Sequence, residues 1–294
     1  MLTIGVDVGG TSIKSALIEV GDAKNPDTYQ ILKFFSLPTE ARKGRDAIVG
    51  NIIKSIEQFE CLDECEAISV ASAGTIDWDS GKVTFATEAL PGFTGLELSK
   101  VLSEHFKRRV VAINDAVGAL VGEGFIGAGK KYDSVMMFTL GTGLGASLLK
   151  DKKLDCQSVV DTRLGHICLY EDGRECLCGK KGCAETYVSA TALKKYGDDN
   201  LYKLFKSNDI IHKNLVANFY KDLTTVMLKS IELYNPDLII VGGGVIELAE
   251  YWWQNFIKEY KQKANTPVAC ASLGNKAGVL GSVYAVLNGS FKNQ

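Results

Sequence analysis

Residues 164–185 read Leu-Gly-His-Ile-Cys-Leu-Tyr-Glu-Asp-Gly-Arg-Glu-Cys-Leu-Cys-Gly-Lys-Lys-Gly-Cys-Ala-Glu. One imidazole and three of the four thiols in this stretch are separated by glycines that let the backbone fold around a point: His166, Cys176, Cys178 and Cys183. Four soft donors at such spacing suit a closed tetrahedral Zn²⁺ site, which is structural because no position is left for water. The alternative, a few buried cysteines in a reducing compartment, fits the density of the cluster less well. Glu185 ends the stretch, so the metal would also fix a carboxylate in place.

The bulk composition excludes two classes of partner. The chain has 294 residues, enough for two domains or one large one. Lys and Arg total 33 against 35 Asp and Glu, so the net charge does not attract nucleic acid or an anionic membrane. No apolar stretch approaches the roughly 20 residues that a membrane helix needs, and the N-terminus shows no signal sequence. We therefore expect no nucleic-acid partner and no membrane association.

The cysteine content indicates the reducing cytoplasm. Eight cysteines in a chain of this size, three of them assigned to a metal, do not suggest a disulfide framework. The other five are expected to be buried or surface thiols: Cys61, Cys65, Cys156, Cys168 and Cys270. Only Cys168, two residues after His166, could compete for the metal.

Predicted strands and helices alternate along the chain, which is typical of a mixed α/β protein with short connections. Apolar runs and alternating patterns predict strands at residues 2–8, 12–20, 67–71, 109–113, 135–140, 146–149 and 238–241. Helical spacing predicts helices at 46–59, 98–106 and 215–233, the last stopped by Asn235-Pro236.

Two glycine turns between apolar strands indicate an internal duplication. They are Asp7-Val8-Gly9-Gly10-Thr11 and Thr139-Leu140-Gly141-Thr142-Gly143-Leu144-Gly145. Glycines there let backbone N–H groups approach an anion, and a threonine hydroxyl adds a donor. Tight hairpins also use glycine for conformational reasons alone, but Asp7 and Lys14 favour phosphate and Mg²⁺ at the first turn. A dinucleotide-binding interpretation is weaker, because a strand rather than a helix follows the second turn.

Asn114-Asp115 directly follows a predicted buried strand. Ligands of α/β proteins bind at the carboxyl ends of such strands, where a carboxylate can accept a proton from a substrate hydroxyl. The structural alternative is that Asp115 simply caps the helix that starts near Ala116.

Taken together, these motifs resemble the ROK family of sugar kinases, within the actin-like, hexokinase-type ATPase superfamily. The resemblance covers nearly the whole chain and is strongest in the run from Cys176 to Glu185, which matches the family's zinc signature. It also includes Gly165-His166 and the tail Ala277-Gly278-Val279-Leu280-Gly281. The resemblance implies a two-domain actin-like (ribonuclease H-like) α/β fold with internal duplication and a structural zinc knuckle. The expected smaller domain is residues 1–113 plus 279–294, and the larger one, with the zinc site, is residues 114–278.

The same resemblance implies a role for each motif. Asp115 is expected to be the general base of a glucokinase-like, ATP-dependent phosphorylation of a hexose hydroxyl, by default the 6-position. Sugar-binding residues would be Gly74, Asn114, Arg163, His166 and Glu185. ATP with Mg²⁺ would be bound by Asp7, Gly9, Gly10, Thr11, Lys14, Thr139, Gly141, Thr142, Gly143, Gly243 and Gly244. The zinc ligands would be His166, Cys176, Cys178 and Cys183. A homodimer is also expected, and the cluster Tyr251-Trp252-Trp253 could serve an interface or pack in the core.

The departures from the family pattern all fall on the sugar side. Arg163 replaces the glutamate of Glu-x-Gly-His, so a donor-only guanidinium stands where an acceptor-only carboxylate is usual. Ala73, Ala89 and Val117 also differ from the usual residues. Arg163 could bind an anionic or acceptor-rich group on the sugar, or it could turn away to pair with Asp161 or Glu171; the second interpretation is favoured.

Two other functional classes stay open from the sequence. A catalytically weak sugar and ATP sensor would explain the altered sugar-side residues. A repressor of the same family would carry a winged-helix segment before the first glycine turn, and no such segment is expected here.

Overall fold

The computed structural model describes residues 1–155 and 157–289, so the prediction for Cys156 lies outside the described residues. Its contacts divide the chain into two compact units. The first comprises residues 1–130, 152–159 and 275–294, and the second comprises residues 131–151 and 160–274. Among the described residues, no helix has the length and apolar character that crossing a membrane requires.

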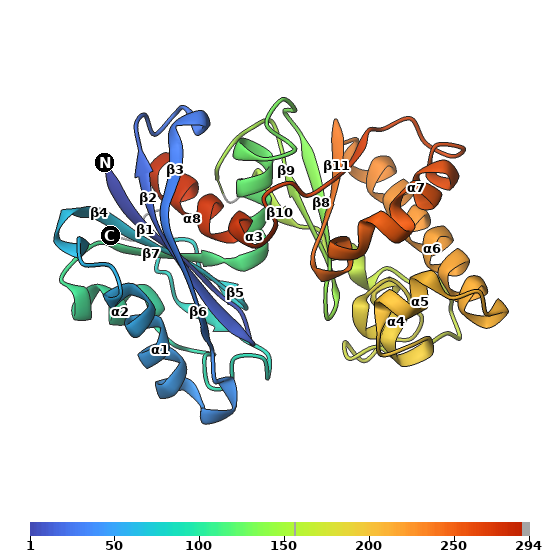
Figure 1. The fold of residues 1–294 in the computed structure, drawn as a ribbon, viewed down its shortest axis with the longest axis horizontal. Helices are drawn as coiled ribbons and strands as arrows, with labels where there is room; N and C mark the ends of the chain where they lie inside the picture. The colour runs from blue at the N-terminus through green and yellow to red at the C-terminus, as the bar shows by residue number, and fades with distance from the viewer. Residues whose placement is uncertain (156, 290–294) are drawn as a thin grey trace. The chain divides into compact units, whose positions relative to one another are not determined.

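The first unit is built on a five-stranded sheet with strand order β3-β2-β1-β4-β7 (Figure 1). Its strands are β1 (Leu2–Val8), β2 (Ser12–Val20), β3 (Tyr29–Pro38), β4 (Cys65–Ser72) and β7 (Val110–Asn114). β1 runs antiparallel to β2 and parallel to β4, and β4 runs parallel to β7. A short hairpin, β5 (Thr75–Ile76) and β6 (Val83–Phe85), follows β4.

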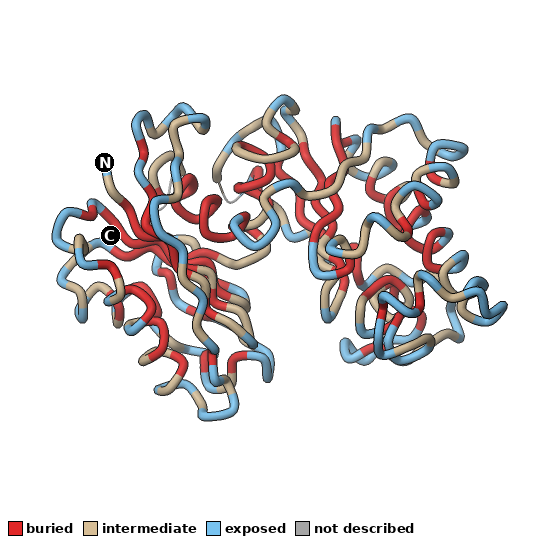
Figure 2. The backbone as a smooth tube through the Cα atoms, viewed as in Figure 1, coloured by how far each residue is buried: buried red, intermediate tan, exposed pale blue. Residues whose placement is uncertain are grey.

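Helices cover both faces of this sheet because alternate residues of a strand point to opposite sides. Ile4, Val6 and Val8 belong to a buried apolar cluster with side chains of α1 (Arg45–Glu57) and α2 (Leu98–Phe106). On the other face, a Cβ on Gly5, between them, would meet Val279 and Val283 of α8 (Ala277–Asn288). Figure 2 shows the buried centre of the sheet.

Two helices of the first unit that lie far apart in the sequence cross at close range. α3 (Asp115–Val121) continues into a π-helical turn, Gly122–Ile126, and packs against α8. The two helices touch at glycines: a Cβ on Gly281 would overlap the carbonyl oxygen of Gly118.

This packing makes the observed division differ from the predicted domain boundaries. Residues 114–130 and 275–278, predicted in the larger domain, belong to the first unit because α3 and the π-helical turn pack on α8. Residues 152–159 join it as well, since the Lys152 ammonium donates hydrogen bonds to the carbonyls of Gly124 and Lys130. Residues 290–294 of the predicted smaller domain lie outside the described residues.

The second unit repeats the sheet of the first, with strand order β10-β9-β8-β11-β12. β8 (Val135–Leu140) runs antiparallel to β9 (Leu144–Leu149) and parallel to β11 (Leu238–Gly242), as β1 does to β2 and β4. β10 (Val159–Asp161) and β12 (Val268–Cys270) are the edge strands. The matching order is what an internal duplication predicts.

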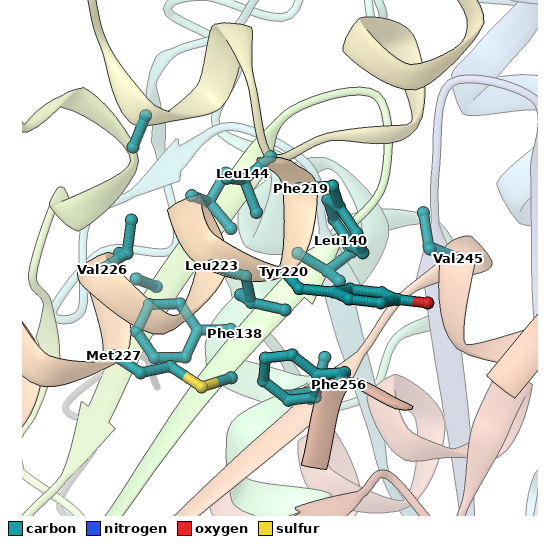
Figure 3. Close-up of a cluster of buried hydrophobic side chains, with 14 of the residues drawn as sticks. Phe138, Leu140, Leu144, Phe219, Tyr220, Leu223, Val226, Met227, Val245 and Phe256 are labelled. Atoms are coloured by element: carbon teal, nitrogen blue, oxygen red, sulfur yellow. The ribbon is translucent and has the colours of Figure 1, made fainter. Parts of the chain in front are cut away.

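The helices of the second unit are α4 (Ala190–Tyr196), α5 (Leu201–Lys206), α6 (Ile210–Tyr234) and α7 (Ala249–Tyr260). α6 begins after Asp209, whose carboxylate accepts from the N–H groups of Ile211 and His212, and it ends at Asn235 in the left-handed region. Phe219, Tyr220 and Leu223 of α6 pack with Phe138 of β8 and Phe256 of α7 (Figure 3). Trp252 is 1% exposed in the same core, so this residue of the predicted aromatic cluster packs internally.

Candidate active site

The predicted site residues fall in both compact units. In the first unit, the turn Gly9–Thr11 joins β1 to β2 and places Asp7 opposite Lys14 in the antiparallel register. Lys14 Nζ lies 3.6 Å from Oδ2 of Asp7, and both side chains are largely covered. Burial raises the pKa of Asp7, although the charge and hydrogen bond of Lys14 lower it in part.

Thr39, a residue that the sequence analysis missed, holds this first turn. Its N–H donates to the carbonyl of Thr11 at 3.0 Å and its hydroxyl donates to the carbonyl of Gly9. Thr39 is fully buried, so water does not compete with these two hydrogen bonds. It follows β3, a strand that pairs with β2, and no local pattern in the sequence connects it with the turn.

Asn114 and Asp115 lie at the carboxyl end of β7, where α3 begins. Asn114, and not Asp115, is the N-cap: its Oδ1 accepts from the N–H of Val117 at 3.1 Å. Its Nδ2 donates to the carbonyl of Gly74 at 2.6 Å and to Oδ1 of Asp115 at 3.0 Å. The structure therefore brings the predicted residues Gly74, Asn114 and Asp115 together. Because Asn114 caps α3, the capping alternative for Asp115 does not apply.

The carboxylate of Asp115 is placed where its charged form is disfavoured. Burial, followed by the nearby charge of Asp7, raises its pKa from 3.8 to about 6, while hydrogen bonds from Ala116 and Asn114 lower it in part. A carboxyl group with a pKa near neutrality can exchange a proton during a reaction at physiological pH. Asp115 is therefore a candidate for a general base.

In the second unit, the turn Gly141–Gly143 joins β8 to β9 as Gly9–Thr11 joins β1 to β2. Thr142 is exposed at its tip, and a Cβ on Gly141 would meet no atom within 4 Å, so this face of the turn is open. The hydroxyl of Thr139 lies against Gly145 at the base of the hairpin.

The turn after β11 lies beside this hairpin. Gly243 has a φ of 87° and packs against the backbone of Leu140, where a side chain would overlap. Gly244 begins a 3-10 segment and has open space where a Cβ would point. Both predicted nucleotide-binding stretches of this unit therefore lie next to each other.

The four predicted metal ligands form one compact cluster: His166, Cys176, Cys178 and Cys183 offer donor atoms that all lie within 4.8 Å of one another. Sγ of Cys178 and Sγ of Cys183 are 3.6 Å apart, and Sγ of Cys176 is 3.7 Å from Nδ1 of His166. In a tetrahedral zinc site with Zn–S bonds of about 2.3 Å, two sulfurs are roughly 3.8 Å apart. The donor set and its spacing therefore fit zinc.

Cys168 does not belong to this cluster. It is exposed, and its backbone pairs with that of Cys183 in an isolated antiparallel bridge. Cys65 is buried, and Cys61 and Cys270 are half-buried, so these thiols have the environments predicted for them.

Glu185 and Arg163 differ sharply in their surroundings. Glu185 lies two residues after Cys183, and its carboxylate is packed against both the metal-ligand cluster and the glycine turn. The Arg163 side chain is 80% exposed, and its Nε lies 3.9 Å from Oδ2 of Asp161. The same aspartate accepts from the Arg163 N–H at 3.0 Å, which agrees with the interpretation that Arg163 turns toward Asp161.

Comparisons with known proteins extend over nearly the whole chain. A model of the ROK family matches residues 3–288. The glucokinase of Thermotoga maritima is 26% identical over 319 aligned residues, which cover 96% of each protein. A structure of the ROK hexokinase from Thermus thermophilus superimposes with a TM-score of 0.80 at 25% identity and covers 98% of both chains. A ROK family glucokinase from Streptomyces griseus, solved with glucose and AMPPNP, gives a TM-score of 0.78 at 27% identity, covering 96% of this chain and 98% of that one.

Proposed function

The chain belongs to the ROK family, and from this premise we propose that Asp115 is the general base of an ATP-dependent sugar kinase. The identification of the family and of a carbohydrate kinase from sequence motifs is confirmed by the family match and by the glucokinase relatives. The reaction transfers the γ-phosphoryl group of ATP to a hydroxyl of a hexose or hexose derivative. The 6-position stays a prediction.

The observation that carries the role of Asp115 is its carboxylate, held by Asn114 at the end of β7 with a pKa of about 6. As the oxygen of the sugar hydroxyl bonds to the γ-phosphorus, the bond to the ADP oxygen breaks and the hydroxyl proton passes to Asp115. Phosphoryl transfer depends mainly on positioning and on stabilisation of charge, so a single well-placed base is the main acid–base group needed.

The two glycine turns are the proposed phosphate-binding elements. The N–H groups of Gly9 and Gly141 donate to the carbonyls of Ser12 and Gly143 within the hairpins. Other backbone N–H groups of the turns and the hydroxyls of the exposed Thr11 and Thr142 would donate to phosphate oxygens. Asp7 would hold the Mg²⁺ that accompanies ATP, with Lys14 beside it. The exposed edge of Gly244 next to the second turn suits the approach of the adenosine.

The metal-ligand cluster is the proposed structural zinc site. His166, Cys176, Cys178 and Cys183 would hold the ion, which would fix the loop that carries Glu185. Glu185 would then accept hydrogen bonds from sugar hydroxyls, and His166, with one ring nitrogen on the metal, would donate from its other ring N–H. Arg163 would contact an anionic group on the sugar only if its side chain turned away from Asp161.

The test of the proposed function is ADP release with a panel of hexoses, hexosamines, N-acetylated sugars and sugar acids. Turnover with any of them is expected; nucleotide binding without turnover on every sugar would favour the sensor alternative. Asp115→Asn should lower kcat at least 100-fold and leave the Kd for AMPPNP within about threefold. Asp46→Asn, an exposed aspartate of α1, is the matched control. The homodimer and the cytoplasmic location remain predictions, testable by light scattering and cell fractionation.

A further inference from the structure

The carboxylate of Glu185 lies directly against the backbone of the second glycine turn. Its Oε2 accepts a hydrogen bond from the N–H of Leu144 at 3.1 Å. A Cβ placed on Gly143 would overlap the same oxygen and would stand 3.0 Å from the carboxyl carbon. The carboxylate therefore fills the space that any side chain at position 143 would need.

The same side chain also reaches the metal-ligand cluster. Glu185 lies in the 3-10 turn Ala184–Thr186, directly after Cys183, and its Oε1 is 3.9 Å from Sγ of Cys176. The segment that carries His166 packs on the hairpin as well, since a Cβ on Gly165 would overlap the carbonyl oxygen of Leu144. One carboxylate thus connects the cluster with the turn.

We propose that Glu185 is a positioning residue for nucleotide binding: it holds the backbone of Gly143 and Leu144 in the conformation that receives the phosphates of ATP. The inference rests on the proposed function, which assigns this turn to the nucleotide, and it adds a second task to a residue assigned to the sugar. A carboxylate offers about four lone-pair sites. Oε2 can therefore keep the N–H of Leu144 while Oε1 accepts from a sugar hydroxyl.

The physical reason is preorganisation of the turn. A hydrogen bond from a backbone N–H to a carboxylate is stronger than one between neutral groups, so it restricts the turn before the nucleotide arrives. Without it, the turn would have to be ordered at the moment of binding. The affinity for nucleotide should then fall even when no sugar is present.

The test is calorimetric titration of AMPPNP into the full-length protein without sugar. Glu185→Ala should weaken binding about tenfold, the effect of losing one charge-assisted hydrogen bond. Glu185→Gln should stay within about threefold of the wild type, because the amide oxygen still accepts from Leu144. Glu171→Ala, an exposed glutamate of the same loop, is the control for lost charge.

A double-mutant cycle separates this role from a general loss of structure. Gly143 lies outside the left-handed region, so an alanine can adopt the same backbone conformation. The expected loss of affinity in Gly143→Ala therefore comes from overlap of the new Cβ with the Glu185 carboxylate. Gly143→Ala should weaken AMPPNP binding more than tenfold, and the added Glu185→Ala change should restore affinity to that of Glu185→Ala alone.

Two results would overturn the inference: unchanged AMPPNP affinity in Glu185→Ala, or a double variant no better than Gly143→Ala. A wild-type protein that binds no AMPPNP at all would instead contradict the assignment of the turn, and with it the proposed function. Loss of sugar turnover in Glu185→Ala with normal AMPPNP affinity would leave Glu185 a sugar ligand only and would reject the positioning role.

Discussion

The side-chain amide of Asn114 donates a 3.0 Å hydrogen bond to the carboxylate of Asp115. The same nitrogen donates to the carbonyl of Gly74, and the amide oxygen caps α3 through the N–H of Val117. Both amide hydrogens are therefore used within the protein, and one lone pair of Oδ1 is left for a sugar hydroxyl. On this geometry, we expect Asn114 to act mainly by orienting Asp115.

Asn114→Ala should therefore change the chemistry of Asp115 as well as the helix cap. Loss of a hydrogen bond to a charged group should lower kcat by about 10- to 100-fold. Because that bond favours the charged form, its loss should also raise the pKa of Asp115 and move the acidic limb of the pH–rate profile to higher pH. Asn200→Ala removes the equivalent cap of α5 and should leave the profile unchanged. A lower kcat with an unshifted profile would indicate a purely structural role.

The wild-type enzyme should lose activity as the pH falls through about 6. The base must be ionised to accept the hydroxyl proton, and burial beside Asp7 raises its pKa from 3.8 to about 6. We expect kcat/KM to fall tenfold for each pH unit below that value and to level off above pH 7. An acidic limb near pH 4 would mean that Asp115 is not the group that titrates.

Because the pKa of Asp115 is raised, its ionised form destabilises the folded protein. The folded protein binds this proton more tightly than the unfolded chain, so the stabilising contribution is present below about pH 4 and is lost as the pH rises through about 6. Asp115→Asn should accordingly raise the free energy of unfolding at pH 8 by about 1 to 3 kcal/mol, at 1.36 kcal/mol per pKa unit. Urea unfolding at pH 8 and at pH 4 measures this, with Asp46→Asn as the control; equal stability of wild type and Asp115→Asn at pH 8 would contradict it.

Sequence patterns predicted the elements that are buried or sharply bounded. The strands at 2–8, 12–20 and 135–140 and the helix at 98–106 have the predicted limits, because each apolar run ends at a glycine turn or another polar break. The sequence patterns do not predict β3. It is an edge strand with apolar side chains, Leu32 and Phe34, at exposed positions, so apolar and polar residues do not alternate along its sequence. Its register comes from pairing with β2 rather than from its own side chains.

The site was predictable where its residues are neighbours in the sequence. The clustering of His166 with the three cysteines follows from local spacing, and so does the adjacency of Asn114 and Asp115. Thr39 and the bond from Leu144 to Glu185 depend on segments far apart in the chain, and no local pattern reports such contacts. The packing of α3 on α8, which places residues 114–130 in the first unit, also joins segments far apart in the chain.

The four-donor cluster should hold one zinc ion per chain, and the nearby thiol of Cys168 should not be needed. Cys178→Ser removes a donor whose sulfur lies 3.6 Å from that of Cys183, so zinc content measured by mass spectrometry should fall well below one per chain. The melting temperature should fall with it, because the free energy of metal binding contributes to folding. Cys168→Ser, in the exposed thiol outside the cluster, should keep full zinc content and the wild-type melting temperature. Equal zinc loss in both variants would show that Cys168 is a ligand, and retention of zinc in both would show that the metal is held elsewhere.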